Sequence, residues 1–136
     1  MTRRILRNSI KCPDGMELVS RHQHDYVSYC DAKNRYFVVD GGSEYRKRSG
    51  VGYTETSVLD DGKFETQRKV CEWGVNLDEN GRLLPDTKWT KIKDLNTEHI
   101  YNILKNVKSI SDFYKRLLED EIIHREEIIM NGDSKF

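Results

Sequence analysis

Two histidines separated by one residue stand in the segment of this chain that is richest in groups able to bind or react. His22 and His24 are followed directly by Asp25, and Asp40 comes later in the same region. In a regular strand, His22 and His24 would point to one face and Asp25 to the other. The two imidazoles and the Asp40 carboxylate could then hold a transition-metal ion. The same spacing also fits two exposed or hydrogen-bonded histidines beside acids, so both interpretations stay open.

A glycine pair and a basic cluster follow the histidines. Asp40-Gly41-Gly42 predicts a tight turn whose backbone N–H groups can face an anion. Arg46-Lys47-Arg48 supplies positive charge for a phosphate-like group. A glycine pair after a strand is also the usual sequence of a simple turn or bulge. The candidate ligand-binding residues are His22, His24, Asp25, Asp40, Gly41, Gly42, Tyr45, Arg46 and Arg48.

The cysteines provide neither a disulfide framework nor a complete zinc site. Cys12, Cys30 and Cys71 are odd in number and contain no CxxC pair. A free cysteine is most often a small buried apolar residue, and only His22 or His24 could pair with Cys12 or Cys30 through the fold. We therefore assign no catalytic residue, no metal and no cofactor, and we favour a protein that is not an enzyme. Reduced thiols indicate a cytosolic setting.

Composition indicates one small domain with a limited core. The 136 residues are 36% hydrophobic and 34% charged, with a mean hydropathy of −0.79. No apolar run approaches the roughly 18 residues of a membrane span, so we expect no membrane association. Lys and Arg number 23, as do Asp and Glu, and this zero net charge disfavours a general nucleic-acid binder. Nucleic-acid binding through Arg3, Arg4, Arg7 and residues 46–48 stays possible.

Turn signals between β-like segments predict a series of antiparallel hairpins over residues 5–92. Pro13-Asp14-Gly15 favours a first hairpin around residues 9–20. Asp61-Gly62 and Asn80-Gly81 are further hairpin dipeptides. The chain up to residue 92 is therefore expected to be a β-rich meander.

The second hairpin would assemble the candidate site. Its clearest strand is Arg35–Val39, which we expect to pair with residues 24–30. A tight turn between the two would place His24-Asp25 opposite Val39-Asp40. This register would bring the histidine segment and the glycine segment together.

Helical periodicity begins after residue 95. The i, i+3, i+4, i+7 spacing of an amphipathic helix is found at Ile100, Ile103, Leu104 and Val107. Asn96 or Thr97 can cap this helix, and Ser111 can cap a second one. Residues 95–130 are therefore expected to form a C-terminal helical hairpin. The whole chain is predicted to have an α+β fold in a single domain.

Three spaced motifs resemble a family of small, mostly uncharacterised proteins encoded by bacteriophages and prophages. They are residues 7–15 (RNSIKCPDG), 20–27 (SRHQHDYV) and 39–48 (VDGGSEYRKR). Members that look similar carry CxxC and CxC pairs in the manner of a zinc ribbon. This chain keeps Cys12 but has Gly15 at the second position, so a Pro-Asp-Gly turn replaces the metal knuckle. The segment from Trp73-Gly74 to Glu126 resembles a second phage-borne module with a hairpin and two helices.

The resemblance implies an accessory protein that a bacteriophage makes in the host cytoplasm. The family supplies no established activity, so we interpret the chain as a non-enzymatic binding module. Its partner would be a host factor or a small anionic ligand, and binding would modulate or counter a host process. The alternative is a metal-dependent hydrolase or nuclease in which His22, His24 and Asp40 hold the ion and lower the pKa of a bound water. Exposed hairpin edges also make a homo-oligomer possible.

Overall fold

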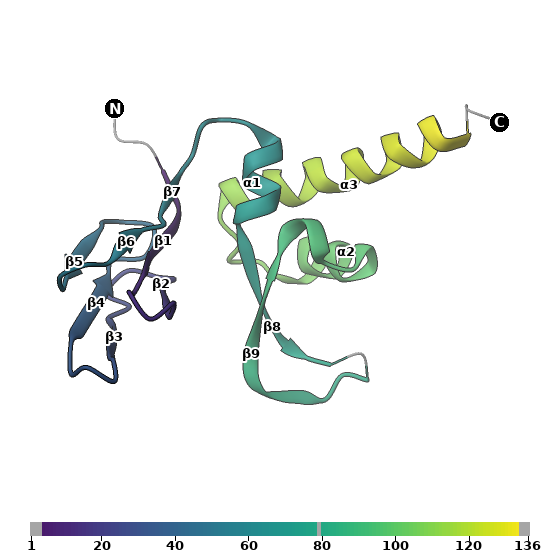
Figure 1. The fold of residues 1–136 in the computed structure, drawn as a ribbon. Helices are drawn as coiled ribbons and strands as arrows, with labels where there is room; N and C mark the ends of the chain where they lie inside the picture. The colour runs from purple at the N-terminus through teal and green to yellow at the C-terminus, as the bar shows by residue number, and fades with distance from the viewer. Residues whose placement is uncertain (1–3, 79, 134–136) are drawn as a thin grey trace. The chain divides into compact units, whose positions relative to one another are not determined.

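The chain folds into two compact units, and both contain antiparallel strands. The computed structural model describes residues 4–78 and 80–133 (Figure 1). Contacts divide the chain into an N-terminal unit, Met1–Lys63, and a C-terminal unit, Phe64–Phe136, which holds the helices. The predicted α+β class, with antiparallel hairpins followed by a C-terminal pair of helices, is confirmed.

The N-terminal unit is built from two small antiparallel sheets. Its strands are β1 (Ile5–Lys11), β2 (Glu17–Ser20), β3 (Val27–Cys30), β4 (Tyr36–Asp40), β5 (Lys47–Ser49), β6 (Thr54–Glu55) and β7 (Val58–Leu59). The first sheet has the order β2-β1-β6, and β7 also pairs with β1. The second sheet has the order β3-β4-β5.

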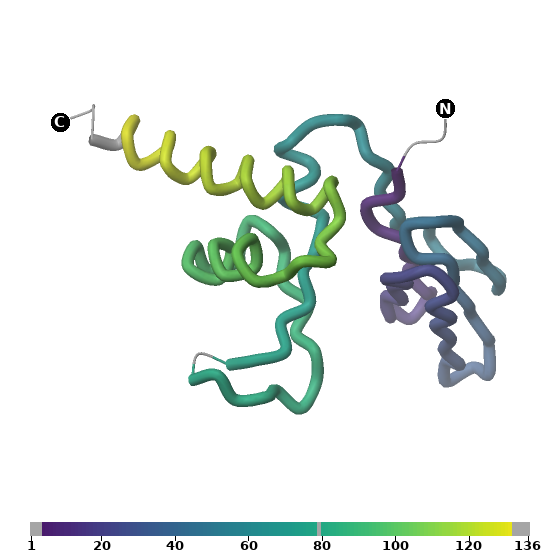
Figure 2. Tube along the Cα trace, turned by 180° about the vertical axis from the view of Figure 1, so that it is seen from behind, coloured from purple at the N-terminus to yellow at the C-terminus, as the bar shows by residue number. Residues whose placement is uncertain are grey.

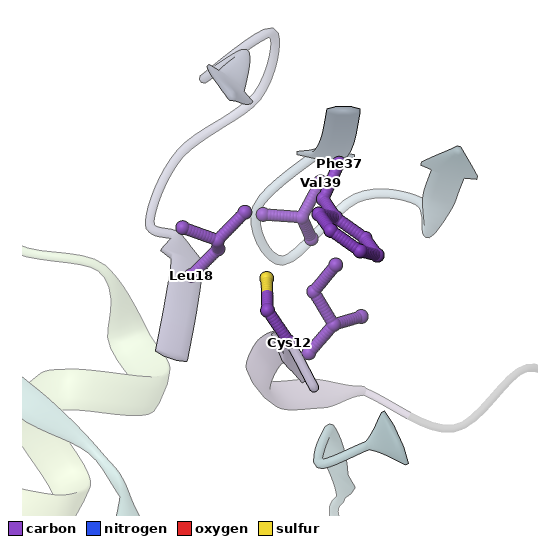
Figure 3. Packing of buried hydrophobic residues seen from close by; sticks show 5 residues of the cluster. Cys12, Leu18, Phe37 and Val39 are labelled. Atoms are coloured by element: carbon purple, nitrogen blue, oxygen red, sulfur yellow. The ribbon is translucent and has the colours of Figure 1, made fainter. Parts of the chain in front are cut away.

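A small apolar cluster joins the two sheets of this unit. Its buried members are Ile10, Cys12, Leu18, Phe37 and Val39 (Figure 3). Phe37 and Val39 alternate along β4, so their face of the strand is turned to the cluster, while the buried Val38 and the half-buried Asp40 lie on the opposite face. Cys12 acts here as an apolar packing residue, and burial together with the nearby charge of Asp14 raises the pKa of its thiol.

The first predicted hairpin is confirmed, and the second differs at its open end. β1 pairs with β2 around a turn in which Gly15 has a φ of +97°. β3 pairs with β4 as expected, but the ladder begins only at Val27, opposite Val39. The prediction that His24-Asp25 lies in this ladder is therefore wrong. Residues 21–26 form a loop, because His24 has a positive φ that a strand cannot accommodate.

The C-terminal unit combines a two-stranded hairpin with three α-helices. Its elements are α1 (Phe64–Val70), β8 (Glu72–Leu77), β9 (Leu83–Lys91), the 3-10 helix η1 (Ile92–Asp94), α2 (Thr97–Asn106) and α3 (Asp112–Asp133). The hairpin predicted at Asn80-Gly81 is confirmed by the pairing of β8 with β9. We expected a single domain whose β-rich part ends at residue 92, whereas the contacts group this hairpin with the helices.

The hairpin predicted at Asp61-Gly62 is wrong, because α1 begins two residues later. The carboxylates of Asp60 and Asp61 accept the backbone N–H groups of Gly62 and Lys63, each at 2.9 Å. Such local side-chain bonds favour the start of a helix as well as a hairpin turn. The dipeptide alone therefore does not distinguish the two outcomes.

Both predicted starts of the C-terminal helices are confirmed. Asn96 Oδ1 accepts the N–H of Glu98 at 2.9 Å, and Ser111 Oγ accepts the N–H of Tyr114 at 3.2 Å. α2 and α3 then pack against each other, as Figure 2 shows. In the described ranges, no helix has the length and apolar character needed to cross a membrane.

A buried carboxylate between two arginines holds the C-terminal unit together. Glu121 of α3 is fully buried and accepts hydrogen bonds from Arg68 of α1 at 2.7 and 3.0 Å. Its second oxygen also accepts from Arg125 at 2.8 Å. Arg125 further donates to Thr97 Oγ1 at 2.7 Å and to the carbonyl of Ile92 at 3.2 Å. One carboxylate and its arginines therefore tie α1, η1 and α2 to α3.

Replacing Glu121 by glutamine should destabilise the C-terminal unit by about 3–5 kcal/mol. Arg68 and Arg125 would keep their charges but lose the buried carboxylate that they share. Tryptophan fluorescence during urea unfolding measures this loss, since Trp73 and Trp89 both lie in this unit. Unchanged unfolding in the variant would show that the carboxylate is not needed there.

The stability of this unit should also fall in acid. Burial raises the pKa of Glu121, but the hydrogen bonds and charges of Arg68 and Arg125 outweigh burial, and the pKa lies below its ordinary value of 4.5. A pKa lowered by folding gives stabilisation that is complete above the unfolded value and is lost as pH falls through the folded value. Unfolding measured across this range should show a smaller acid-dependent loss in Glu121→Gln than in the wild type.

Candidate functional site

The histidine loop, residues 21–26, is closed by Asp25. The N–H of Asp25 donates to the carbonyl of His22 at 3.0 Å, and its Oδ2 accepts the N–H of Arg21 at 2.8 Å. Its carbonyl accepts the hydroxyl of Ser20 at 2.7 Å. The hydrogen bonds of Asp25 therefore stabilise the loop itself. His22 stays largely in solvent, with 72% of its side chain exposed and Nε2 3.8 Å from Asp25 Oδ1.

His24 is held in a conformation that few residues other than glycine adopt. Its φ is +64°, in the left-handed region, and the residue is exposed. Its Nδ1 lies 2.8 Å from the hydroxyl of Tyr45, and that hydroxyl lies 3.3 Å from Asp40 Oδ2. The two rings are 5.8 Å apart between centroids. The structure thus joins His24, Tyr45 and Asp40, three of the predicted residues, in one hydrogen-bonded chain.

The direction of these hydrogen bonds determines what the ring of His24 can do. Burial, then the charge of Asp40 and the hydrogen bond to it, raise the pKa of Tyr45. A carboxylate oxygen can only accept, so the Tyr45 hydroxyl donates to Asp40 Oδ2 and its oxygen accepts from Nδ1–H of His24. We assign the neutral ring to this tautomer. Nε2 then carries a lone pair and makes no hydrogen bond to a described residue, so it can accept from a partner, and a proton on Nε2 makes it a donor that suits an anion.

The glycine pair lets the turn after β4 approach the histidine loop closely. Gly41 and Gly42 have φ values of +112° and +52°. A Cβ on Gly42 would lie 2.5 Å from the Cα of His22, and one on Gly41 would lie 2.7 Å from the carbonyl carbon of Tyr45. The N–H of Gly42 donates to Ser20 Oγ at 2.9 Å. We had expected this N–H to face an anion. It is instead directed at the protein.

Asn8 of β1 is the residue of this site that the sequence did not reveal. It is 1% exposed, and its Nδ2 donates to the carbonyls of Asp40, Gly42 and Tyr45 at 3.1, 3.0 and 2.9 Å. Two N–H groups are shared among three acceptors, so the amide fixes the whole turn that carries Tyr45. The sequence offered only an amide inside the first predicted strand, residues 5–12, where four of the eight residues are polar or charged.

Two buried acceptor atoms accompany this turn. Asn8 Oδ1 and Asp40 Oδ1 have no hydrogen-bond donor within the part of the chain that the structure describes. Each such atom costs of order 1–3 kcal/mol relative to a satisfied one.

The basic residues beyond the turn have different roles. Arg48 donates from Nε and Nη2 to the two oxygens of Glu55, at 2.5 and 2.8 Å, and from Nη2 to Ser57 Oγ at 2.6 Å. The hydrogen bonds of Arg48 lower the pKa of Glu55 to about 2. Arg48 is therefore engaged in joining β5 to the segment around β6. Arg46 is exposed and is the cluster residue better placed to meet a ligand.

The metal-dependent hydrolase and the nucleic-acid binder, the two other interpretations of the sequence, gain no support from this geometry. His22 and His24 do not share a strand face, because both lie in a loop. Among residues 4–78 and 80–133, no group of three or more His, Cys, Asp or Glu side chains could hold a metal ion. In the N-terminal basic patch, Arg7 pairs with Glu17, and Arg3 lies outside the described residues. Metal-dependent hydrolysis and nucleic-acid binding stay predictions.

Known proteins add no assignment to this site. No protein-family model, no curated protein and no solved structure gives a significant match to the chain. The functional argument is therefore carried by the hydrogen bonds and the backbone conformation around His24.

Gly42→Ala should destabilise the N-terminal unit by more than about 2 kcal/mol, because the new Cβ would overlap the backbone of His22. Gly15→Ala is the matched control in the same unit. Gly15 also has a positive φ, but a Cβ there meets nothing within 4 Å, so the cost should be only about 1 kcal/mol of backbone strain. Amide hydrogen exchange in β1 and β4 measures both variants. Equal losses would contradict the close approach of turn and loop.

Proposed function

We propose that this protein is a non-enzymatic binding module whose partner contacts the ring of His24. The partner would be a host factor or a small ligand that presents an anionic group. The observation that carries the proposal is the conformation of His24, which combines a strained backbone, an exposed ring and a fixed ring orientation.

The backbone conformation at this position does not require a histidine. A residue other than glycine in a sparsely populated backbone region costs of order 1–3 kcal/mol. Glycine or asparagine would serve the turn at lower cost, and Asn34, with a φ of +63°, is such a solution in the same unit. His24 instead presents an imidazole to solvent and holds it with Tyr45 at 2.8 Å. An oriented, exposed ring at a strained position suits recognition of a partner.

The groups around His24 suit an anionic partner and offer little for catalysis. A protonated His24 can donate from Nε2, His22 is exposed two residues away, and Arg46 is exposed next to Tyr45 in the sequence. The hydrogen bonds of His22 and His24 in the described chain go to the Gln23 carbonyl and to Tyr45. Among the described residues, no serine, threonine or cysteine is therefore paired with either ring, so covalent catalysis by one of these nucleophiles gains no support.

The wider role that we propose is that of a bacteriophage accessory protein in the host cytoplasm, where binding modulates or counters a host process. Support comes from the way the three motif segments meet. Asn8, from residues 7–15, donates to the carbonyl of Gly42, and the N–H of Gly42 donates to Ser20 of residues 20–27. The residues behind the resemblance are thus the ones that build the site.

His24→Gly tests this function, because it removes the ring and keeps the backbone conformation. The stability of the N-terminal unit should stay within about 1 kcal/mol of the wild type. Binding should weaken by at least about tenfold, the value of one charge-assisted hydrogen bond. Binding is measured in two ways, by NMR titration with inorganic phosphate and by quantitative capture of proteins from a bacterial lysate.

Asn34→Gly is the matched control, since it makes the same backbone change at an exposed turn outside the site. It should bind phosphate and capture proteins as the wild type does. Binding by His24→Gly equal to that of Asn34→Gly would sink the proposal. Unfolding of the N-terminal unit in His24→Gly would instead show that the ring is structural.

A further inference from the structure

The distal half of α3 carries an exposed apolar line. Ile123 and Met130 are seven residues apart, so they lie one above the other on the helix surface, and they are 52% and 70% exposed. Ile128 and Ile129 add to the exposed apolar surface of the same segment. Figures 1 and 2 both show this part of α3 reaching beyond α2. Residues seven apart occupy the same position of successive heptads, so Ile123 and Met130 offer one exposed apolar position per heptad to a packing partner.

Acidic residues border this line on both sides. The four neighbours of Ile123, at i−4, i−3, i+3 and i+4, are Glu119, Asp120, Glu126 and Glu127. The last two are also the i−4 and i−3 neighbours of Met130. Within the described ranges, Asp120 alone of the four has a cation close by, Arg116 at 3.9 Å. We name Ile123, Met130 and these four acids the distal seam.

The charge of the distal seam decides which occupant fits it. When two helices pack along an apolar line, the residues that border the line face those of the partner. A second copy of this chain would bring acids against acids, and an anionic lipid surface would also repel the seam. A helix whose apolar line is bordered by Lys or Arg matches the distal seam both in its apolar surface and in the sign of its border charges. We propose that the distal seam docks an amphipathic helix with basic borders from another protein.

This docking surface goes beyond the site around His24 and lies in the other unit of the chain. It uses exposed side chains, so it needs no rearrangement of the C-terminal unit. Its affinity would come from burial of the apolar line, and its selectivity from the acidic borders.

Two synthetic peptides test the charge selection with the full chain. Both carry leucine at the a and d positions of a heptad repeat, with lysine at e and g in one peptide and glutamate in the other. Fluorescence anisotropy of labelled peptide should show the lysine peptide binding at least about tenfold more tightly than the glutamate peptide. The difference should shrink as salt is raised, because the border charges are exposed.

Variants assign the binding to the distal seam. Ile123→Ser with Met130→Ser should weaken binding of the lysine peptide by about tenfold, through loss of apolar burial. Glu126→Lys with Glu127→Lys should reverse the preference between the two peptides. Glu44→Lys with Asp86→Lys is the control, because it makes the same change in net charge at exposed residues outside α3. Circular dichroism establishes that each variant is folded.

Three outcomes would overturn the proposal. The first is equal binding of the two peptides, and the second is equal binding by the seam variants and the control. The third is occupation of the seam by something else. Sedimentation equilibrium would reveal this as a dimer that dissociates in Ile123→Ser with Met130→Ser. If the occupant were a lipid surface, the wild type would bind phosphatidylserine vesicles and Ile123→Ser with Met130→Ser would not. A monomer that binds the lysine peptide through the seam and ignores the vesicles is the expected result.

Discussion

The side-chain amide of Asn8 is the interaction on which the candidate site depends. It reaches from β1 of one sheet to three carbonyls of the turn that follows β4 of the other. That turn carries Tyr45, and Tyr45 positions the ring of His24. The glycine pair allows the close approach, and the amide fixes it. The apolar cluster joins the sheets, but a single polar side chain sets the geometry of the site.

Local signals in the sequence predicted much of the fold. Turns at Gly15 and Asn80-Gly81 and the caps at Asn96 and Ser111 each depend on a few neighbouring residues, and the structure has them. The failure at Asp61-Gly62 has the same origin, since one short pattern serves both a hairpin turn and a helix start. The extent of the β3–β4 ladder depends on the positive φ of His24, which the periodicity of the sequence does not predict.

The candidate site was predicted only in part. Side-chain chemistry identified His24, Asp40 and Tyr45 as candidates, and the structure joins them by hydrogen bonds. The roles of Asn8 and Arg48 could not be read from the sequence. Asn8 bonds to a turn more than 30 residues away, and Arg48 bonds to Glu55 on a strand of the other sheet. Residue type suggests what a side chain can do, whereas tertiary contacts decide whether it is used for structure or left for a partner.

The tautomer of His24 tests the central claim most directly. Nitrogen-15 chemical shifts of the imidazole, measured where the ring is neutral, distinguish a proton on Nδ1 from one on Nε2. The chain from His24 through Tyr45 to Asp40 predicts the proton on Nδ1, with Nε2 free to meet a partner. A proton on Nε2, or rapid averaging between the two nitrogens, would contradict an oriented ring and the binding role built on it.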